Sequence, residues 1–291
     1  MHNRDCKSFN GIYSCDILKT EDYQDCSECK FYEKIDKKIL ILKLGAMGDV
    51  LRTTTILPAI KKKYGRNTHI TWLVDEKSKE LLENNHYIDR ILTYSQESIL
   101  QLQQENFDVL FSLEVSPPAT LIANLIQAEE KFGYFFDKDS HPNYFNKSAE
   151  SYLENVFSDY KNLQDKRTYQ EMLFEITELE YEKQPYVLNL QLPKIKSGKV
   201  VGINIGSGDR WSSKAWHPDN IKELIRKLPK NYKVILLAGP QEKELLSDIV
   251  YDLKSENINV ETNNPNNTIK EFIFVLNRCD LIVTGDTLAL H

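Results

Sequence analysis

One carboxylate stands in a turn bounded by glycines near the start of the chain. The stretch KKILILKLGAMGDVLRTTTILPAI (37–60) is an apolar run that breaks at Gly45 and Gly48, carries an acid at Asp49, and resumes as a segment expected to be helical from about Asp49 or Thr53. Glycine permits a sharp backbone path and the close approach of a ligand. An acid here can cap the helix or, at the carboxyl end of a strand, take a proton from a bound hydroxyl, and the residues alone leave both roles open.

A second group of candidate binding residues lies in INIGSGDRWSSKAWHPDNIKELI (203–225). Gly206 and Ser207 follow an apolar segment, and Arg210 and Lys214 precede a predicted helix. Backbone N–H groups followed by two cations can bind a diphosphate, although a basic loop without a ligand explains the same residues.

The glycine spacing of GAMGD (45–49) excludes two common kinds of nucleotide site. It is neither the GxGxxG fingerprint of dinucleotide-binding proteins nor the GxxxxGK[ST] loop that holds phosphates. An NAD-dependent oxidoreductase and a P-loop ATPase are therefore not expected.

Four of the five cysteines lie ahead of the first apolar run, at Cys6, Cys15, Cys26 and Cys29. A C-x2-C pair with two further cysteines can form a tetrahedral four-thiolate site, and in a cytosolic chain this pattern indicates a metal more often than disulfides. Zinc and iron of the rubredoxin type both fit, and unlinked thiols or oxidised pairs are the alternative. Four protein ligands leave no open position, so the expected role is structural. Cys279 is expected to be a core thiol.

The totals describe an ordinary globular chain long enough for two domains. It has 291 residues, 41% hydrophobic and 27% charged, with a formal net charge of -6. This acidic balance does not favour nucleic acid as a partner. The sequence shows neither a signal core nor a membrane-length apolar run, so a cytoplasmic location is expected. The basic stretch IKKKYGR (60–66) could contact the inner face of a membrane, but adjacent lysines at a helix end are more often solvent-exposed.

Apolar runs separated by helix-length segments predict an α/β fold in two blocks. The expected strands are 38–44, 68–74, 90–94 and 107–113 in the first block, and 199–206, 232–239 and 279–285 in the second. The expected helices include 145–177, 219–228 and 242–253. The expected organisation is a Cys-rich head at 1–36, a Rossmann-like domain at 37–192, a linker within 191–199, and a second Rossmann-like domain at 198–291 that lacks a final helix and strand.

The segment ILILKLGAMGDVLRTTTILPAIKKKYG (39–65) resembles the opening of the glycosyltransferase family 9 enzymes, the ADP-heptose heptosyltransferases. The resemblance extends over nearly the whole chain after residue 37. It implies a GT-B architecture, in which two Rossmann-like domains face a cleft and hold the acceptor and the nucleotide-sugar respectively. Asp49 then matches the catalytic base of the family, and Gly45 and Gly48 form the turn on the acceptor side.

Three motifs of the second block resemble donor-binding motifs of the same family. Lys214 in KAWHP matches a lysine that contacts the donor phosphate, with one extra residue before the proline. Gly239 and Glu242 in LLAGPQEKEL match GGPxE, whose acid reaches the ribose hydroxyls. In LIVTGDTLALH, Asp286, Thr287 and His291 match DTGPMH, while Leu288 replaces a glycine and Ala289 a proline. Binding of the diphosphate by backbone N–H groups remains compatible with these replacements.

The resemblance implies an inverting glycosyltransferase that moves a heptose, or a similar sugar, from an ADP-sugar to a hydroxyl. Lipopolysaccharide core, another glycan and protein are all candidate acceptors, and some protein-modifying members resemble this chain in carrying cysteine-bound iron. Lys214, Arg210 and the amides near Thr287 are expected to stabilise the leaving ADP. No catalytic metal is expected, because no D-x-D pair lies near the donor motifs.

Two matters stay open at this stage. The chain could form a homo-oligomer. The departure at Leu288 and the shortened second block also allow a non-catalytic nucleotide-sugar-binding or assembly protein, against which the retention of Asp49 and Lys214 speaks.

Overall fold

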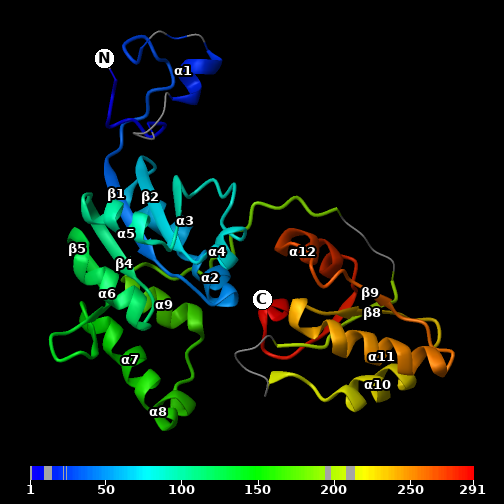
Figure 1. Cartoon of the computed structure of the whole chain (residues 1–291). Coiled ribbons are helices and arrows are strands. Elements are labelled where there is room, and N and C mark those ends of the chain that lie inside the picture. The colour runs from blue at the N-terminus through cyan, green and yellow to red at the C-terminus, as the bar shows by residue number, and fades with distance from the viewer. Residues whose placement is uncertain (1, 10–14, 22, 24, 194–197, 208–213) are drawn as a thin grey trace. The chain divides into compact units, whose positions relative to one another are not determined.

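The structure of the chain is a computed structural model that describes residues 2–9, 15–21, 23, 25–193, 198–207 and 214–291. The chain forms two compact units, Met1–Asn189 and Leu190–His291 (Figure 1). The boundary between them lies next to the segment 191–199, where the sequence predicts a linker. Each unit is an α/β structure, as the periodicity predicts.

The Cys-rich head is part of the first compact unit. It contains the short helix α1 (Asp16–Thr20) and an isolated antiparallel bridge between Cys6 and Lys34. Among the described residues of the head, Cys6 and Leu18 are the buried apolar ones. An ion pair of 3.2 Å between Lys7 Nζ and Asp89 Oδ1 joins the head to the domain that follows.

The first unit is built on a six-stranded sheet in the order β3-β2-β1-β4-β5-β6. All neighbouring strands are parallel except β5 and β6, which are antiparallel. Chain order runs outward from β1 to β3 and then restarts at β4 on the other side of β1, which makes the gap between β1 and β4 a topological switch point. The strands are β1 (Lys37–Leu42), β2 (Thr68–Val74), β3 (Arg90–Thr93), β4 (Asn106–Ser112), β5 (Gln127–Phe136) and β6 (Pro142–Tyr144).

Helices connect these strands and cover the sheet. They are α2 (Met47–Thr53), α3 (Ile56–Tyr64), α4 (Glu76–Lys79), α5 (Gln96–Gln103), α6 (Pro117–Leu125), the 3-10 turn η1 (Lys147–Ala149), α7 (Glu150–Phe157), α8 (Asp159–Gln164) and α9 (Tyr169–Thr177). Because alternate residues of a strand point to opposite faces, each parallel strand buries one set of side chains under each layer of helices.

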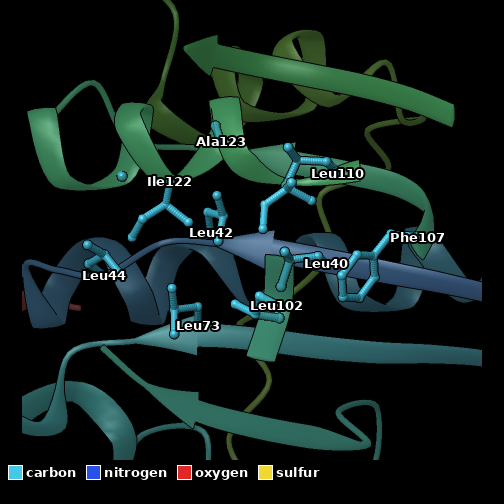
Figure 2. Packing of buried hydrophobic residues seen from close by; sticks show 11 residues of the cluster. Leu40, Leu42, Leu44, Leu73, Leu102, Phe107, Leu110, Ile122 and Ala123 are labelled. Carbon is cyan, nitrogen blue, oxygen red and sulfur yellow. The ribbon is translucent and has the colours of Figure 1, made fainter. Parts of the chain in front are cut away.

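One face of this sheet packs against α5 and α6. Leu40 and Leu42 of β1 pack in one cluster with Ile122 of α6 (Figure 2). Other members of this cluster are Leu73, Leu102 and Leu110. On the other face, Tyr64 of α3 meets Phe111 of β4 edge to face, with ring centroids 6.5 Å apart. The central strand β1 is therefore buried on both sides, which fixes the direction in which its carboxyl end leaves the sheet.

The second unit has a four-stranded parallel sheet in the order β10-β7-β8-β9. Its switch point lies between β7 and β10, since β8 follows β7 on the other side. The strands are β7 (Val200–Asn204), β8 (Lys233–Leu237), β9 (Glu261–Thr262) and β10 (Leu281–Val283). The helical segments are α10 (Pro218–Lys227), η3 (Pro240–Glu242), α11 (Lys243–Ser255), α12 (Ile269–Asn277) and η4 (Leu288–Leu290).

Two helical layers close the core of the second unit. α10 and α11 lie side by side on one face (Figure 1), where Ile221 and Ile249 pack with Ile203 of β7. On the other face, α12 packs near Ile235, together with Cys279. Burial raises the pKa of the Cys279 thiol. Cys279, predicted to be a core thiol, is partly buried against this cluster.

The sequence prediction of individual elements is right for the long apolar runs and incomplete elsewhere. β5, β6, β9 and α12 were not predicted, and α2 begins at Met47, ahead of the expected start near Asp49 or Thr53. None of the helices in the described part of the chain combines the length and the apolar character that crossing a membrane requires.

Gly133 is required in β5, and the chain offers a matched control. Both Gly133 and Gly65 have a positive φ, of 91° and 94°. A Cβ at Gly133 would lie 1.9 Å from the carbonyl oxygen of Ser112, whereas a Cβ at Gly65 would meet nothing within 4 Å. We expect Gly65→Ala to lower the free energy of unfolding by about 1–2 kcal/mol, the cost of the left-handed conformation.

Gly133→Ala should cost at least about 2 kcal/mol more, because the strand must also shift to relieve the overlap. Urea unfolding of the two variants measures the difference. If both variants lose the same free energy of unfolding, β5 can shift away from Ser112 at this position without a loss of stability.

Candidate active site

Asp49 lies in the first turn of α2 but does not cap it. The N-cap of α2 is Ala46, whose side chain cannot accept a hydrogen bond, and Asp49 is three residues further on. Of the two roles that the sequence leaves open for Asp49, the structure removes the N-cap. Gly45 lies in the turn before the helix, and Gly48 lies inside the helix.

The Asp49 carboxylate faces two cations and remains in contact with solvent. Arg52 Nη2 pairs with its Oδ1, and Lys43 Nζ is 3.7 Å from its Oδ2. The side chain of Asp49 is 32% exposed, whereas that of Lys43 is only 6% exposed. A carboxylate held in this way keeps a fixed orientation and an accessible edge.

Glu114 anchors this arrangement from the neighbouring strand. Its Oε2 is 3.8 Å from Lys43 Nζ and accepts hydrogen bonds from the backbone N–H groups of Leu44 at 2.9 Å and Gly45 at 3.2 Å. Its other oxygen accepts from Ser116 Oγ. Glu114 therefore fixes the path of the turn, and its negative charge lies close to the ammonium group of Lys43.

The cluster of Lys43, Asp49 and Glu114 lies at the switch point of the first sheet. Lys43 follows β1 and Glu114 follows β4, and these strands are parallel neighbours. Ligands of open α/β sheets bind at the carboxyl ends of strands at such a point. The position of Asp49 thus agrees with a role toward a bound molecule.

Arg52 is held in place by an aromatic ring. Its guanidinium carbon lies 4.0 Å from the ring centroid of Tyr169, and the Tyr169 hydroxyl is 3.4 Å from Thr53 Oγ1. Burial, followed by the Asp49 charge, raises the pKa of Tyr169, so this ring stays neutral. Arg52 Nε is buried and has no hydrogen-bond partner among the described residues.

Asp75 crowds the other side of the Gly45 turn. A Cβ at Gly45 would lie 3.3 Å from Asp75 Oδ2, which is tight and leaves little room for a side chain. Burial, and then the nearby Glu114 charge, raise the pKa of Asp75. Glycine at 45 is thus explained by the space that the surrounding carboxylates leave.

In the second unit, Gly206, Gly239 and Glu242 come together. A Cβ at Gly206 would lie 2.2 Å from the Glu242 carboxyl carbon, so the carboxylate packs directly on the Gly206 backbone. The N–H of Gly239 donates to Glu242 Oε2 at 3.0 Å. A side chain at 206 would displace the Glu242 carboxylate from this position.

Lys214 and Asp286 form a second group of predicted residues. Lys214 Nζ is 2.7 Å from Asp286 Oδ2, and His291 Nε2 is 3.9 Å from Asp286 Oδ1. A Cβ at Gly285 would lie 2.4 Å from the carbonyl oxygen of Lys214, so the two backbone segments touch. A cation is thereby held beside the turn that follows β10.

Asn204 links the ends of β7 and β10. Its Nδ2 donates to the carbonyl of Gly206 at 2.9 Å and to the hydroxyls of Thr284 and Thr287, both at 3.1 Å. Thr287 precedes Leu288, the first residue of η4. One amide thus joins the two predicted phosphate-binding turns at the switch point of the second sheet.

Most of the predicted site residues lie in one cluster of the first unit or in the two groups of the second unit. Gly45 and Asp49 belong to the first cluster, and the second unit brings together the two groups just described, with Ser207 following Gly206. Arg210 lies outside the described residues. Sequence reasoning missed Lys43, Arg52, Glu114, Tyr169 and Asn204. A lysine closing an apolar run and an asparagine ending VVGIN (200–204) were signals that could have found Lys43 and Asn204.

The head cysteines meet around one small cavity. Cys6, Cys15, Cys26 and Cys29 all line a space of about 20 Å³, together with Leu18, Phe31 and other residues of the head. All four are free thiols. Within the described ranges, however, no three His, Cys, Asp or Glu side chains are grouped so that they could hold a metal ion. The predicted metal site is therefore not shown.

The chain is similar in fold to solved structures that are described as glycosyltransferases. A glycosyl transferase family 9 structure from Veillonella parvula is 20% identical with a TM-score of 0.60, covering 85% of this chain and 75% of that one. The structure of E. coli ADP-heptose lps heptosyltransferase II is 15% identical with a TM-score of 0.60, covering 87% of this chain and 80% of that one. The chain has the mixed α/β fold of these structures.

Sequence comparison identifies the family. The family described as glycosyltransferase family 9 (heptosyltransferase) matches residues 98–291, and the chain belongs to it. Lipopolysaccharide heptosyltransferase 1 of Campylobacter coli is 24% identical over 285 residues, which cover 87% of this chain and 80% of that relative. The protein is accordingly a glycosyltransferase enzyme, as its motifs predict.

The contribution of Lys43 can be measured against Lys38, a lysine of the strand that Lys43 follows. Lys43→Met removes the cation shared by Asp49 and Glu114, and we expect the free energy of unfolding to fall by roughly 1–3 kcal/mol because two close carboxylates lose their counter-charge. Lys38→Met, at an exposed position of β1, should change it by less than about 0.5 kcal/mol.

Urea unfolding checks both variants. The double variant Lys43→Met with Glu114→Gln should recover part of the loss, since one of the two carboxylates is then neutral. Equal stability of Lys43→Met and Lys38→Met would show that the cluster is not stabilised by charge.

Proposed function

We propose that the protein transfers a heptose, or a similar sugar, from an ADP-sugar to a hydroxyl of a lipopolysaccharide-core acceptor, with inversion at the anomeric carbon. The proposal is supported by membership of glycosyltransferase family 9 and by the names of the similar proteins, a lipopolysaccharide heptosyltransferase and an ADP-heptose heptosyltransferase. The observation that carries the mechanism is Asp49, held by Lys43 and Arg52 at the carboxyl edge of the first sheet.

The donor is proposed to bind at the switch point of the second sheet. Backbone N–H groups of Ser207 and Leu288 would receive the diphosphate, together with that of Thr287 once it releases the carbonyl of Gly285, and fixed dipoles would stabilise the developing negative charge. Lys214 pairs with Asp286 in the structure and would exchange this partner, in whole or in part, for a phosphate oxygen. Arg210 remains a predicted second cation.

Glu242 is proposed to contact the ribose hydroxyls of the nucleotide. Its Oε2 is tied to the N–H of Gly239, and the carboxylate lies against Gly206. The contact would orient the nucleoside relative to the diphosphate.

Asp49 is proposed to be the general base. The acceptor oxygen forms a bond with the anomeric carbon, the bond from that carbon to the diphosphate oxygen breaks, and the hydroxyl proton passes to the Asp49 carboxylate. Attack opposite to the leaving ADP inverts the anomeric centre. Lys43 and Glu114 act as positioning residues, because they hold the carboxylate and the turn without meeting the acceptor themselves.

Replacing Asp49 tests this assignment. Asp49→Asn keeps the shape of the side chain and should lower kcat by about 10²–10⁴-fold, the usual contribution of a general base. The affinity for ADP should stay within about twofold, because Asp49 is not part of the donor site. Product mass spectrometry with ADP-heptose and isolated acceptors, together with calorimetry of ADP binding, gives both values.

A matched control is Asp159→Asn, an exposed aspartate in the first turn of α8, which should leave both values unchanged. Lys214→Ala should weaken ADP binding, which Asp49→Asn should leave nearly unchanged. Unchanged transfer in Asp49→Asn would refute the assigned base. Binding of ADP-heptose with no transfer to any lipopolysaccharide, glycan or protein acceptor would favour a non-catalytic nucleotide-sugar-binding role.

We also propose that the head binds a structural zinc or iron ion through Cys6, Cys15, Cys26 and Cys29. The fit rests on their convergence around one small cavity and on the absence of disulfides among them. Few apolar side chains are buried among the described residues of the head, so its folding would gain much from four metal–sulfur bonds. The thiolates would have to draw closer than they lie in the structure.

Elemental analysis of protein purified without chelator tests the head. We expect about one zinc or iron per chain in the unaltered protein and in Cys279→Ser, and a loss of most of it in Cys26→Ser, because three thiolates hold a metal more weakly. Removal of the metal should also lower the melting temperature. Metal-free protein, or equal metal in the two variants, would remove the proposal.

A further inference from the structure

A polar cavity of about 540 Å³ lies in the first unit, on the side of the sheet away from Asp49. Its walls come from the head, including Arg4 and Lys7, and from the amino-terminal ends of strands, including Lys38 of β1 and His69 of β2. In Figure 1 the head joins β1 at this edge, whereas α2 follows the opposite end of the strand. The six residues of β1 span about 20 Å, so a molecule in the cavity cannot touch Asp49.

The acidic residues in the wall of the cavity are already paired. Asp89 is within 3.2 Å of Lys7 Nζ and 3.5 Å of Lys61 Nζ. Glu105 receives two hydrogen bonds from Arg90, at 2.9 and 2.7 Å. Asp16, at the head side, pairs with Lys19 at 3.0 Å.

Not all of the cationic residues in the wall of the cavity form ion pairs with carboxylates. The side chains of Arg4 and Lys38 line the cavity and have no ion pair or hydrogen bond within the described part of the chain. His69 lies on the same wall. Two uncompensated cations and an imidazole thus face a space whose carboxylates are neutralised, which leaves the cavity with a surplus of positive charge.

The pKa of His69 reflects the surplus of positive charge in the cavity. Burial lowers its pKa most, Asp89 opposes this, and the charges of Arg90, Lys38 and Lys61 lower it further. The cations around the imidazole therefore resist its protonation. An anion bound beside them would reverse that effect.

Apolar side chains complete the wall. Phe9, Ile35 and Phe107 line the cavity alongside the charged groups. Its volume falls within the range of about 300–1,000 Å³ that small-molecule sites occupy. A bare phosphate ion would leave most of this space unfilled.

We propose that this cavity is a binding site for a small organic phosphate, whose phosphate group is held by Arg4, Lys38 and His69 and whose apolar part lies against Phe9, Ile35 and Phe107. A phosphate monoester has a charge near -2 and three acceptor oxygens, which suits three separate donors better than a single carboxylate does. The site is independent of the proposed sugar transfer, and its occupant would act on the enzyme only from a distance.

Phenyl phosphate and inorganic phosphate are the probes for this site. Each is titrated into the full chain at constant ionic strength, and the imidazole proton signals of His69, assigned by their loss in His69→Gln, are followed by NMR over a range of pH. We expect a saturable shift and a rise in the pKa of His69 with phenyl phosphate, because a bound anion stabilises the imidazolium. Phenyl phosphate should bind at least about tenfold more tightly than inorganic phosphate, since burial of its ring adds to the affinity.

Two variants and one control localise the binding. Lys38→Ala and Arg4→Ala should each weaken phenyl phosphate binding by about tenfold, the usual scale for one lost charged contact. Lys30→Ala, an exposed head lysine that does not line the cavity, should leave it unchanged. Circular dichroism confirms folding of each variant.

Three results would overturn the proposal. They are the absence of a saturable shift at His69, an affinity for phenyl phosphate that Lys38→Ala and Arg4→Ala leave unaltered, and equal weakening in Lys30→Ala. Equal affinities for the two probes would reduce the site to a simple anion site and overturn the organic part of the ligand. None of these readouts depends on sugar transfer, so they are distinct from failure of the proposed function.

Discussion

The candidate active site depends on one carboxylate, Glu114, which follows β4 and supports a turn and a proposed base that follow β1. Glu114 accepts the backbone N–H groups of Leu44 and Gly45 and faces Lys43, which in turn faces Asp49. The turn after β1 therefore takes its path from a residue that follows β4. Because β1 and β4 are buried parallel neighbours, their carboxyl ends are held at a constant separation. The side chains that follow them, Lys43 and Glu114, are therefore held at fixed positions relative to each other.

The same topological rule places the donor candidates in the second unit. The turns after β7 and β10 meet at the switch point, and Asn204 joins them through one side-chain amide. Each sheet thus offers ligand-binding groups where its strand order reverses. This arrangement fits the glycosyltransferase family 9 membership of the chain, since transfer of a sugar needs a base for one substrate and an anion site for the other.

The sequence predicts single strands and helices and the motifs that resemble a family. It does not predict contacts between residues that are far apart along the chain. The run THITWLV (68–74) predicts β2 residue for residue, because β-branched and aromatic residues favour a strand. β5 was missed because QAEEKFGYFF carries charges along a strand near the edge of the sheet. Glu114 and Lys43 are separated by a whole βαβ unit, so no local pattern connects them. The cysteine spacing predicts a metal, but the described geometry leaves that prediction unconfirmed.

Each unit closes its own hydrophobic core, with one cluster between β1 and α6 and another between β7 and α10. A change in the packing of one unit therefore need not disturb the other. Substitutions that repack the core of one unit can then accumulate over evolutionary time without repacking the core of the other.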